Sequence, residues 1–252
     1  MGQLSMYKGK RILALIAARG GSKGLHRKNL RDLAGKPLIA WSITQAAASE
    51  RIDRVIVSTE DDEIAETSRQ FGADVPLLRP KELATDSSPV SEAILHVMRS
   101  LKSMGETYDI VMLLECTSPV RYPDDIDNAI AALTDNPGAQ SVVGVVELTH
   151  EHPTWTFRLS AGYLSSFISG GHSQENLRRQ ALEKTYLPFS IYLTWWRSFE
   201  LYRSFYQPRT LPYLLRREQM ADIDDEVDFF ITESIMKKYI LSSRKESVDK
   251  HA

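Results

Sequence analysis

Near the start of the chain, a glycine-rich turn that carries several basic side chains follows an apolar run. The run Ile12–Ala18 has the length and composition of a buried strand, and Gly20, Gly21 and Gly24 follow it. Glycines let the backbone approach an anion closely, so that N–H groups can point at it while nearby cations neutralise its charge. The basic side chains of this turn are Arg19, Lys23, Arg27 and Lys28. We therefore predict a polyphosphate site here, although a plain turn with solvated surface cations explains the same residues equally well.

The spacing of the turn excludes the two commonest phosphate-binding motifs. A Walker A loop needs Gly-Lys-Ser/Thr after a four-residue gap, and a dinucleotide-binding turn needs Gly-x-Gly-x-x-Gly. The chain instead has Arg-Gly-Gly-Ser-Lys-Gly at residues 19–24, followed by Lys28 and Asn29. A polyphosphate bound here would therefore sit in a different class of loop.

Two aspartates, Asp222 and Asp224, stand two positions apart near the end of the chain. In an extended segment, side chains two positions apart point to the same face, where two carboxylates can share one hard cation such as Mg²⁺. Asp225 and Glu226 continue the acidic run. The competing interpretation is therefore an acidic start to the last helix, which the helix dipole favours.

The composition is that of a globular protein without a membrane span. The 252 residues carry a net charge of −2, which argues against a sequence-independent nucleic-acid binder, because such domains are strongly basic. No apolar run approaches the roughly 20 residues that a membrane helix needs. The single cysteine, Cys116, cannot form an intramolecular disulfide, and the first residues lack the apolar core of a secretory signal. We therefore expect cytoplasmic residence, and neither nucleic acid nor membrane as a partner.

Strands and helices alternate over the first part of the chain, where the predicted phosphate turn joins the first strand to the first helix. Strands are predicted at residues 11–18, 54–58, 74–78, 109–114 and 140–146, and helices at residues 38–49, 59–71, 88–103 and 123–133. This alternation is typical of an α/β fold with a mostly parallel sheet and helices on both faces. The fold is therefore predicted to be Rossmann-like.

The pattern changes after residue 150, where aromatic and polar residues mix and helical periodicity is weak. We predict a small inserted β lobe at 151–185, with a turn at Gly170-Gly171-His172, between two parts of one core at 8–150 and 186–241. The later elements are predicted as a return strand at 189–194, a short helix at 201–204, an extended segment at 209–215 and a last helix at 227–239. The polar residues 242–252 are expected to form a flexible tail.

Several motifs, taken in order, resemble those of the acylneuraminate cytidylyltransferases (the CMP-sialic acid synthetase family), which activate nine-carbon acidic sugars. Besides the turn at 19–29, the motifs are Leu33–Ile39, Val57–Asp61, Arg79–Asp86, Thr117–Arg121, His152-Pro153 and Asp222–Asp224. Together they cover most of residues 11–232. Because several ordered motifs coincide by chance far less often than one, the resemblance favours membership of this family.

The resemblance implies a three-layer nucleotide-diphospho-sugar transferase fold, CTP and a sugar acid as substrates, Mg²⁺ as cofactor and a homodimer built partly from the lobe. It assigns nucleotide binding to Ala17, Ala18, Arg19, Gly20, Ser22, Lys23, Asn29, Arg79, Ser88 and Ser91. Lys28 would stabilise the pentavalent α-phosphate, and Asp222 and Asp224 would hold the metal. The expected catalytic residues are Arg19, Lys28 and Glu115.

The chain departs from the family pattern at two places on the expected sugar side. Glu115 stands where similar proteins usually carry glutamine, and Pro188-Phe189-Ser190 stands where they show Asn-Gly-Ala. Either the substrate contact differs at Glu115, or this carboxylate acts as a base toward the attacking hydroxyl, or it is a structural acid that caps backbone N–H groups. The sugar is accordingly open: a sialic acid relative such as a legionaminic or pseudaminic acid, or another sugar. A nucleotidyltransferase for another nucleotide and a non-catalytic nucleotide-binding relative are the alternative functions.

Overall fold

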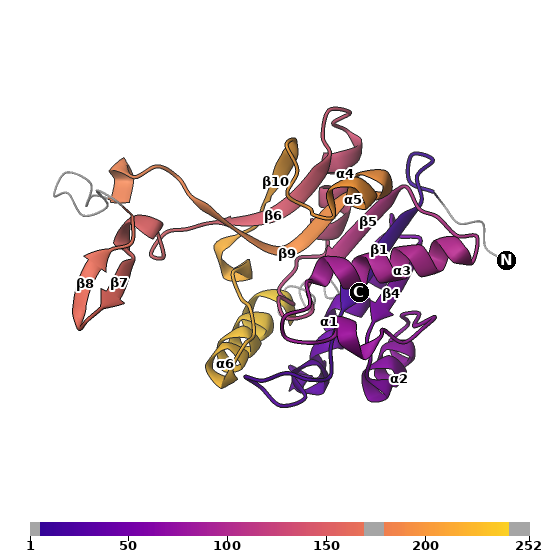
Figure 1. The fold of residues 1–252 in the computed structure, drawn as a ribbon, viewed down its shortest axis with the longest axis horizontal. Helices are drawn as coiled ribbons and strands as arrows, with labels where there is room; N and C mark the ends of the chain where they lie inside the picture. Colours follow the sequence, from indigo (N-terminus) through magenta and orange to yellow (C-terminus); the bar gives the residue numbers. More distant parts are fainter. Residues whose placement is uncertain (1–5, 169–178, 242–252) are drawn as a thin grey trace, which may run out of the picture.

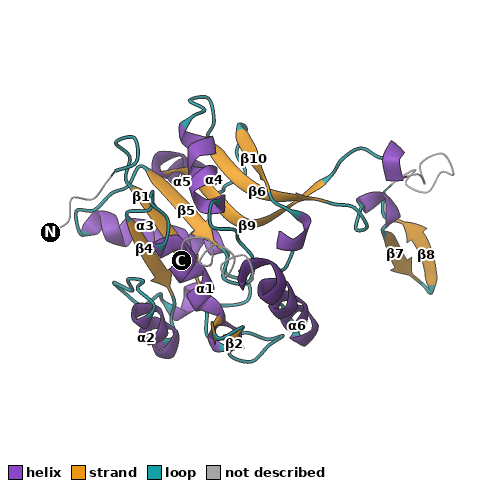
Figure 2. Ribbon diagram, turned by 180° about the vertical axis from the view of Figure 1, so that it is seen from behind, coloured by secondary structure: helices purple, strands orange, loops and turns teal. Residues whose placement is uncertain are grey.

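A six-stranded sheet forms the centre of the fold, and helices cover both of its faces (Figures 1 and 2). The computed structural model describes residues 6–168 and 179–241. The strand order is β10 (Thr210–Leu214), β6 (Ser141–Glu147), β9 (Tyr186–Trp195), β5 (Ile110–Leu114), β1 (Ile12–Ala17) and β4 (Arg54–Ser58). Only β9 runs antiparallel to its neighbours in this sheet. The predicted α/β class with a mostly parallel sheet is confirmed.

The side chains of β1 alternate between two apolar layers, because successive residues of a strand point to opposite faces. Ile12, Ala14 and Ile16 pack with α1 (Leu38–Ala47), α2 (Asp62–Gln70) and α4 (Asp125–Thr134). Leu13 and Leu15 pack with α3 (Val90–Ser103) and α5 (Trp196–Tyr202). The sheet is therefore buried on both faces, as its near-continuous apolar strands require.

The last helix packs against the glycine-rich turn and α1. It runs as α6 (Glu226–Ile235) and continues as a π-helical stretch, Met236–Leu241. Phe229, Met236 and Ile240 pack with Leu25 of the glycine-rich turn and with Trp41 of α1. A two-stranded ribbon, β2 (Asp32–Leu33) and β3 (Lys36–Pro37), connects this turn to α1. Within the described ranges, every helix is too short or too polar to cross a membrane.

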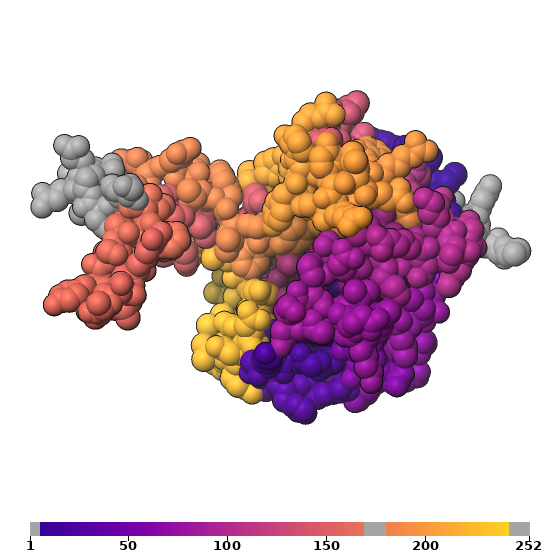
Figure 3. Space-filling view, in the orientation of Figure 1, coloured from indigo at the N-terminus to yellow at the C-terminus, as the bar shows by residue number. Residues whose placement is uncertain are grey.

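A small hairpin projects away from the core, at the end of the long strands β6 and β9 (Figure 3). It consists of β7 (Phe157–Ser160) and β8 (Tyr163–Ser166), joined by a turn with positive φ at Ala161 and Gly162. Such two-residue turns match the right-handed twist of the flanking strands. The hairpin lies inside the segment predicted as an inserted lobe, whereas the predicted turn at 170–172 and the tail at 242–252 lie outside the described residues.

Two short elements were predicted wrongly. Residues 74–78 form a single bridge, Asp74 to Ile56, instead of a strand, and Pro76 lacks the N–H that a continued ladder would need. The short helix predicted at 201–204 starts earlier, as α5, directly after β9. Strand β9 also begins before its predicted start and reaches into the lobe connection.

Candidate active site

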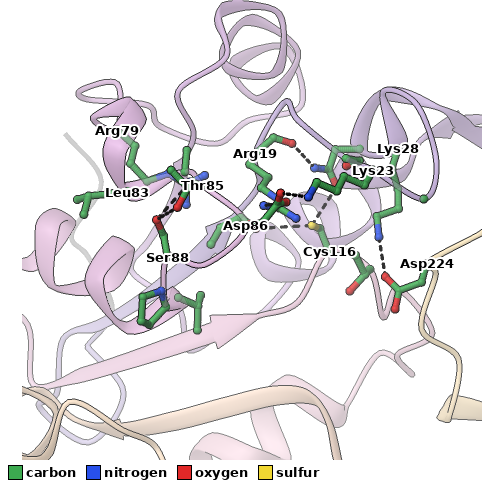
Figure 4. Close-up of a pocket in the computed structure, with 18 residues that line it drawn as sticks. Arg19, Lys23, Lys28, Arg79, Leu83, Thr85, Asp86, Ser88, Cys116 and Asp224 are labelled. Carbon is green, nitrogen blue, oxygen red and sulfur yellow. Dashed lines mark hydrogen bonds and ion pairs between the residues drawn. The ribbon is translucent and has the colours of Figure 1, made fainter.

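A pocket of about 530 Å³ opens at the carboxyl ends of β1 and β5 (Figure 4). Its walls come from the glycine-rich turn, from the 3₁₀ helix Lys81–Leu83 with the loop that leads to α3, and from the segment before α6. The carboxyl edge of a parallel sheet is where open α/β folds bind ligands, because the loops and helix N-termini converge there. The predicted phosphate turn therefore forms one wall of a real cavity.

The turn is held in place from below by Asn29, which is buried. The Asn29 amide donates to the carbonyl of Arg19 at 2.9 Å, and its oxygen accepts from the Cys116 thiol at 3.2 Å. Burial raises the pKa of that thiol to about 11, so it stays protonated at neutral pH. Cys116 is therefore a packed donor that lines the pocket rather than a nucleophile.

Glu60 links the turn to a second wall of the pocket, and no role for it was predicted. One carboxylate oxygen accepts from the Gly20 N–H at 2.7 Å, and the other accepts from the buried Arg79 guanidinium at 3.0 Å. Gly20 has no room for a side chain, because an added Cβ would clash with Asp61. The predicted motif Val57–Asp61 therefore fixes the turn and Arg79 relative to each other.

Three cations of the turn face the pocket. Arg19 pairs with Asp86 at 2.7 Å, and Lys23 pairs with the same carboxylate. Lys28, whose side chain is only 11% exposed, pairs with Asp224 at 3.0 Å and donates to the Ile223 carbonyl at 2.5 Å. These contacts gather the positive charge on one cavity, where an anion of several charges would be attracted.

The fourth basic residue of the turn points elsewhere. Arg27 has a positive φ of 52° and pairs with Asp61 at 2.6 Å, at the start of α2. It therefore anchors the turn to the N-terminus of α2. Of the four cations predicted to surround a polyphosphate, only three face the pocket.

The segment before α6 presents two carboxylates on one side, as alternation predicts. Ala221 and Ile223 are buried, whereas Asp222 and Asp224 are exposed. Asp222 accepts from the Ser118 hydroxyl at 3.2 Å. In the described ranges, no group of three or more His, Cys, Asp or Glu side chains could hold a metal ion. Two carboxylates nevertheless fit Mg²⁺, because this ion is usually held by one or two carboxylates together with substrate phosphates and water.

Glu115 lies at the end of β5, beside the pocket. Its carboxylate accepts the Ser190 N–H at 3.0 Å and faces the Tyr192 hydroxyl. Burial raises the pKa of Glu115 above its usual range, and the negative charge of Asp222 adds to this effect. The sequence left open that Glu115 caps backbone N–H groups, and its carboxylate does accept one such N–H, that of Ser190.

Most of the predicted nucleotide and metal residues lie around this one pocket. Those that line it are Ala17, Arg19, Ser22, Lys23, Lys28, Asn29, Arg79, Ser88 and Asp224. Ala18, Gly20, Ser91, Glu115 and Asp222 do not line it. Ala18 and Gly20 instead use their N–H groups inside the fold, on Ser58 and Glu60, and Ser91 lies in the first turn of α3.

Other residues line the pocket without having been singled out. They include Leu83, Thr85, Asp86 and Thr117. Leu83 and Asp86 belong to the motif Arg79–Asp86, in which the sequence assigns only Arg79 to the nucleotide. The rest of this motif was the signal from which their place in the pocket could have been predicted.

The mostly parallel sheet, the basic turn at its carboxyl edge and the pocket between them define an α/β nucleotidyltransferase-like fold. A family model described as "Cytidylyltransferase" matches residues 13–164. The chain belongs to this cytidylyltransferase family.

Curated relatives are similar over most of the chain. The CMP-N,N'-diacetyllegionaminic acid synthase of Legionella pneumophila is 36% identical over 229 residues, which cover 90% of this chain and 97% of the relative. The pseudaminic acid cytidylyltransferase of Campylobacter jejuni is 30% identical, over 89% of this chain and 96% of its own. The N-acylneuraminate cytidylyltransferase of Escherichia coli is 33% identical over 90% of this chain, which matches 52% of that longer protein.

Solved structures show the same fold at low sequence identity. A CMP:2-keto-3-deoxy-manno-octonic acid synthetase, determined with CTP, aligns with a TM-score of 0.69 at 16% identity, over 91% of this chain and 100% of that one. A 4-diphosphocytidyl-2C-methyl-D-erythritol synthase from Anaerococcus prevotii aligns with a TM-score of 0.57 at 12% identity, over 91% and 100% of the two chains. The predicted nucleotidyltransferase fold is thereby confirmed.

Proposed function

We propose that this protein is a cytidylyltransferase that uses CTP to activate a nonulosonic, sialic-acid-like sugar acid, with a CMP-sugar and pyrophosphate as products. The observation that carries the proposal is the convergence of Arg19, Lys23 and Lys28 on one pocket beside Asp224, in a chain of the cytidylyltransferase family. Relatives named for legionaminic, pseudaminic and N-acylneuraminic acids support a sugar acid of this class.

The reaction is a displacement at phosphorus. The anomeric hydroxyl oxygen of the sugar acid forms a bond to the α-phosphorus of CTP, and the bond from that phosphorus to the oxygen bridging to the β-phosphate breaks with its electron pair. Such a reaction needs mainly positioning and charge neutralisation. Arg19 and Lys23 would hold the phosphates, and Lys28 would neutralise the charge that develops at the α-phosphate. Arg79 and Ser88 would border the nucleoside.

The proton of the anomeric hydroxyl needs an acceptor, and we assign this role to Glu115. Glu115 directly precedes Cys116, which lines the pocket, and its carboxylate accepts the Ser190 N–H. Because burial raises the pKa of Glu115, the carboxylate is a stronger base than an exposed glutamate would be. Its fixed contact with the backbone N–H orients it, so the capping role and the base role are compatible.

Asp222 and Asp224 are the residues that would hold Mg²⁺. Bound there, the ion would neutralise phosphate charge as a Lewis acid. Lys28 contacts Asp224 in the protein itself, so this cation and this carboxylate are already neighbours. The contact supports a metal on the phosphate side, with Asp224 as the ligand that lines the pocket.

Among the nonulosonic acids, a legionaminic-type sugar is our first choice. The Legionella relative named for N,N'-diacetyllegionaminic acid matches at 36% identity, whereas the neuraminate and pseudaminate relatives match at 33% and 30%. The replaced positions Glu115 and Pro188-Phe189-Ser190 support a substrate other than ordinary sialic acid. Another sugar or nucleotide stays the alternative.

Pyrophosphate release tests the proposal directly. Purified protein with CTP, Mg²⁺ and a panel of legionaminic, pseudaminic and N-acetylneuraminic acids should release pyrophosphate, fastest with the first sugar. Asp224→Asn should abolish most of this release, whereas Glu226→Gln should keep it, because Glu226 belongs to the same acidic run but pairs with Arg31 and does not line the pocket. Silence across the whole panel would exclude the function. Thermal shifts with the four nucleoside triphosphates identify the base, because a ligand well above its Kd stabilises by a few kcal/mol.

We also propose a homodimer and a cytoplasmic location. Support for the dimer comes from the projecting hairpin, in which Leu159, Tyr163 and Leu164 are 75%, 79% and 67% exposed. Apolar side chains gathered on a projecting element are typical of an interaction site. The cytoplasmic location rests on the single free cysteine, Cys116, because an intramolecular disulfide is excluded.

A further inference from the structure

Arg121 is a buried cation that has no acidic partner at ion-pair distance among the residues that the structure describes. Its side chain is only 1% exposed and is among the largest fully buried ones. None of the ion pairs within the described part of the chain includes it. Burial lowers the pKa of Arg121 to about 10, so the side chain is still charged at neutral pH. A buried charge is costly, and a protein core would be filled at lower cost by an apolar residue.

The guanidinium of Arg121 joins three segments that are distant in the sequence. Nη2 donates to the carbonyl of Glu115 at 2.6 Å and to the carbonyl of Ser190 at 2.9 Å. Nη1 donates to Ser42 Oγ at 2.9 Å and to Gln45 Oε1 at 3.0 Å, both on α1. A planar, fixed set of donors suits such a junction, whereas the single ammonium of lysine does not.

The two carbonyls that Arg121 holds belong to a strained place in the sheet. Ser190 has a φ of 71°, which non-glycine residues rarely adopt, and the register of β9 against β6 shifts opposite it. Gly144 faces this shift, and a Cβ there would come within 2.6 Å of the Phe189 carbonyl. Strained backbone persists only when the surrounding contacts hold it, and it gathers at functional sites.

This strained place and the Glu115 carboxylate form one unit. The Ser190 N–H donates to the Glu115 carboxylate at 3.0 Å, and the Glu115 N–H donates to the Ser190 carbonyl at 3.1 Å. Arg121 binds the carbonyls of both residues from behind. The direction of the Glu115 carboxylate is therefore set by a contact pair that Arg121 locks.

We propose that Arg121 is a positioning residue for the sugar-acid half of the reaction, acting through Glu115 and Ser190. The inference rests on the proposed function, in which Glu115 accepts the proton of the attacking hydroxyl. Arg121 is buried and does not line the pocket, so we expect it to act without contacting either substrate. Its effect should be confined to the sugar acid, since other residues, Asn29 and Glu60, hold the backbone of the turn that carries Arg19, Lys23 and Lys28.

If Arg121 only filled the core, its substitution would lower the stability of the protein and change the kinetics with CTP and with the sugar acid to the same extent. Arg121→Lys and Arg121→Met keep much of the side-chain volume but lose the fork of donors. Both variants should lower kcat/KM for the sugar acid on the order of 10²-fold, because small misplacements at a reacting centre are costly, and leave KM for CTP within about twofold. The matched control is Arg54→Lys, a half-buried arginine that pairs with Asp74 and Glu106 away from the site. It should leave both parameters unchanged.

Kinetics of pyrophosphate release with each substrate varied, together with melting curves, measure these effects. Equal losses toward CTP and sugar acid, or no loss in a folded Arg121 variant, would overturn the proposal. If both variants fail to fold, the double variant Ser42→Ala/Gln45→Ala decides. It removes both acceptors of Nη1, together with the Ser42 contact to the Glu115 carbonyl and the Gln45 contact to the Pro119 carbonyl. It should cause a smaller loss in the same sugar-specific direction, and a folded double variant without that loss refutes the role. An inactive wild-type protein would instead refute the proposed function.

Discussion

At the residue scale, the carboxylate of Asp86 lies between two cations that the proposed reaction needs for phosphate. Arg19 and Lys23 both pair with it, and the positive charge of Lys23 and Arg19 lowers the pKa of Asp86, so the carboxylate is charged at neutral pH. A triphosphate must compete with this carboxylate for the same donors. Asp86 therefore sets how tightly the pocket holds CTP.

We expect Asp86→Asn to bind CTP about two- to fivefold more tightly, as is reasonable for the loss of an exposed competing ion pair. Calorimetry with CTP at low and high salt measures the effect, which should shrink as salt screens the charges. Glu82→Gln is the matched control, because it removes the same charge from the same loop but pairs with neither cation. Weaker binding by Asp86→Asn would show that Asp86 arranges the cations instead of competing for them.

The proposed base gives a pH dependence with a definite sign. Burial raises the pKa of Glu115 above its ordinary value of 4.5, and a base must be ionised to work. The rate should therefore fall as the pH drops through this raised pKa, at a higher pH than for an exposed glutamate. Glu115→Gln should lose about 10²- to 10⁴-fold in kcat and also lose this acidic limb.

The measurement is pyrophosphate release by both proteins over a pH series that runs from acidic to alkaline buffer. CTP binding, followed by thermal shift, serves as the control and should not change in Glu115→Gln. If Glu115→Gln kept the rate and the pH profile of the wild-type protein, Glu115 would not be the base and would have only its structural contact with Ser190.

At the element scale, the glycine-rich turn and the segment before α6 are fitted together. A Cβ on Gly24 would lie far inside contact distance of the Asp224 carbonyl, whereas a Cβ on Gly21 would meet nothing within 4 Å. The phosphate-side cations and the proposed metal ligands therefore depend on the same close approach of two backbones.

Gly24→Ala should lower kcat/KM for CTP by on the order of 10- to 100-fold, because it pushes the turn and Asp224 apart. Gly21→Ala, in the same turn, should cause a much smaller change. Steady-state kinetics with CTP varied compares the two variants, and circular dichroism checks their folding. If both substitutions had equally small effects, the close approach would carry no functional weight.

The local features of this protein could be predicted from its sequence, whereas the contacts between distant segments could not. The strand, the basic turn and the alternation around Ile223 were predictable, because each follows from neighbouring residues and from the two-residue period of extended chain. The junction at Arg121 and the bridge by Glu60 were not, since each depends on which distant segments come together. The strand expected at 74–78 fails for a local reason that was overlooked, namely Pro76.

At the scale of the whole molecule, the hairpin projects away from the core (Figures 1 and 3). Leu159 and Leu164 are direct cross-strand partners, so they lie on the same face of the hairpin, and both are strongly exposed. Two large apolar side chains held in water on a projecting ribbon gain free energy when another surface covers them. A second copy of the chain is the partner that the resemblance to acylneuraminate cytidylyltransferases implies.

The wild-type protein should therefore behave as a dimer in sedimentation or light scattering, and Leu159→Asp/Leu164→Asp should shift it to monomer. The shift is expected because burying two carboxylates in an apolar contact is costly, whereas exposed substitutions change folding stability by only about 0.5 kcal/mol. Ser165→Asp adds a charge to the opposite face of the same hairpin and should leave the dimer intact. A monomeric wild-type protein, or a double variant that stays dimeric, would remove the hairpin from the interface.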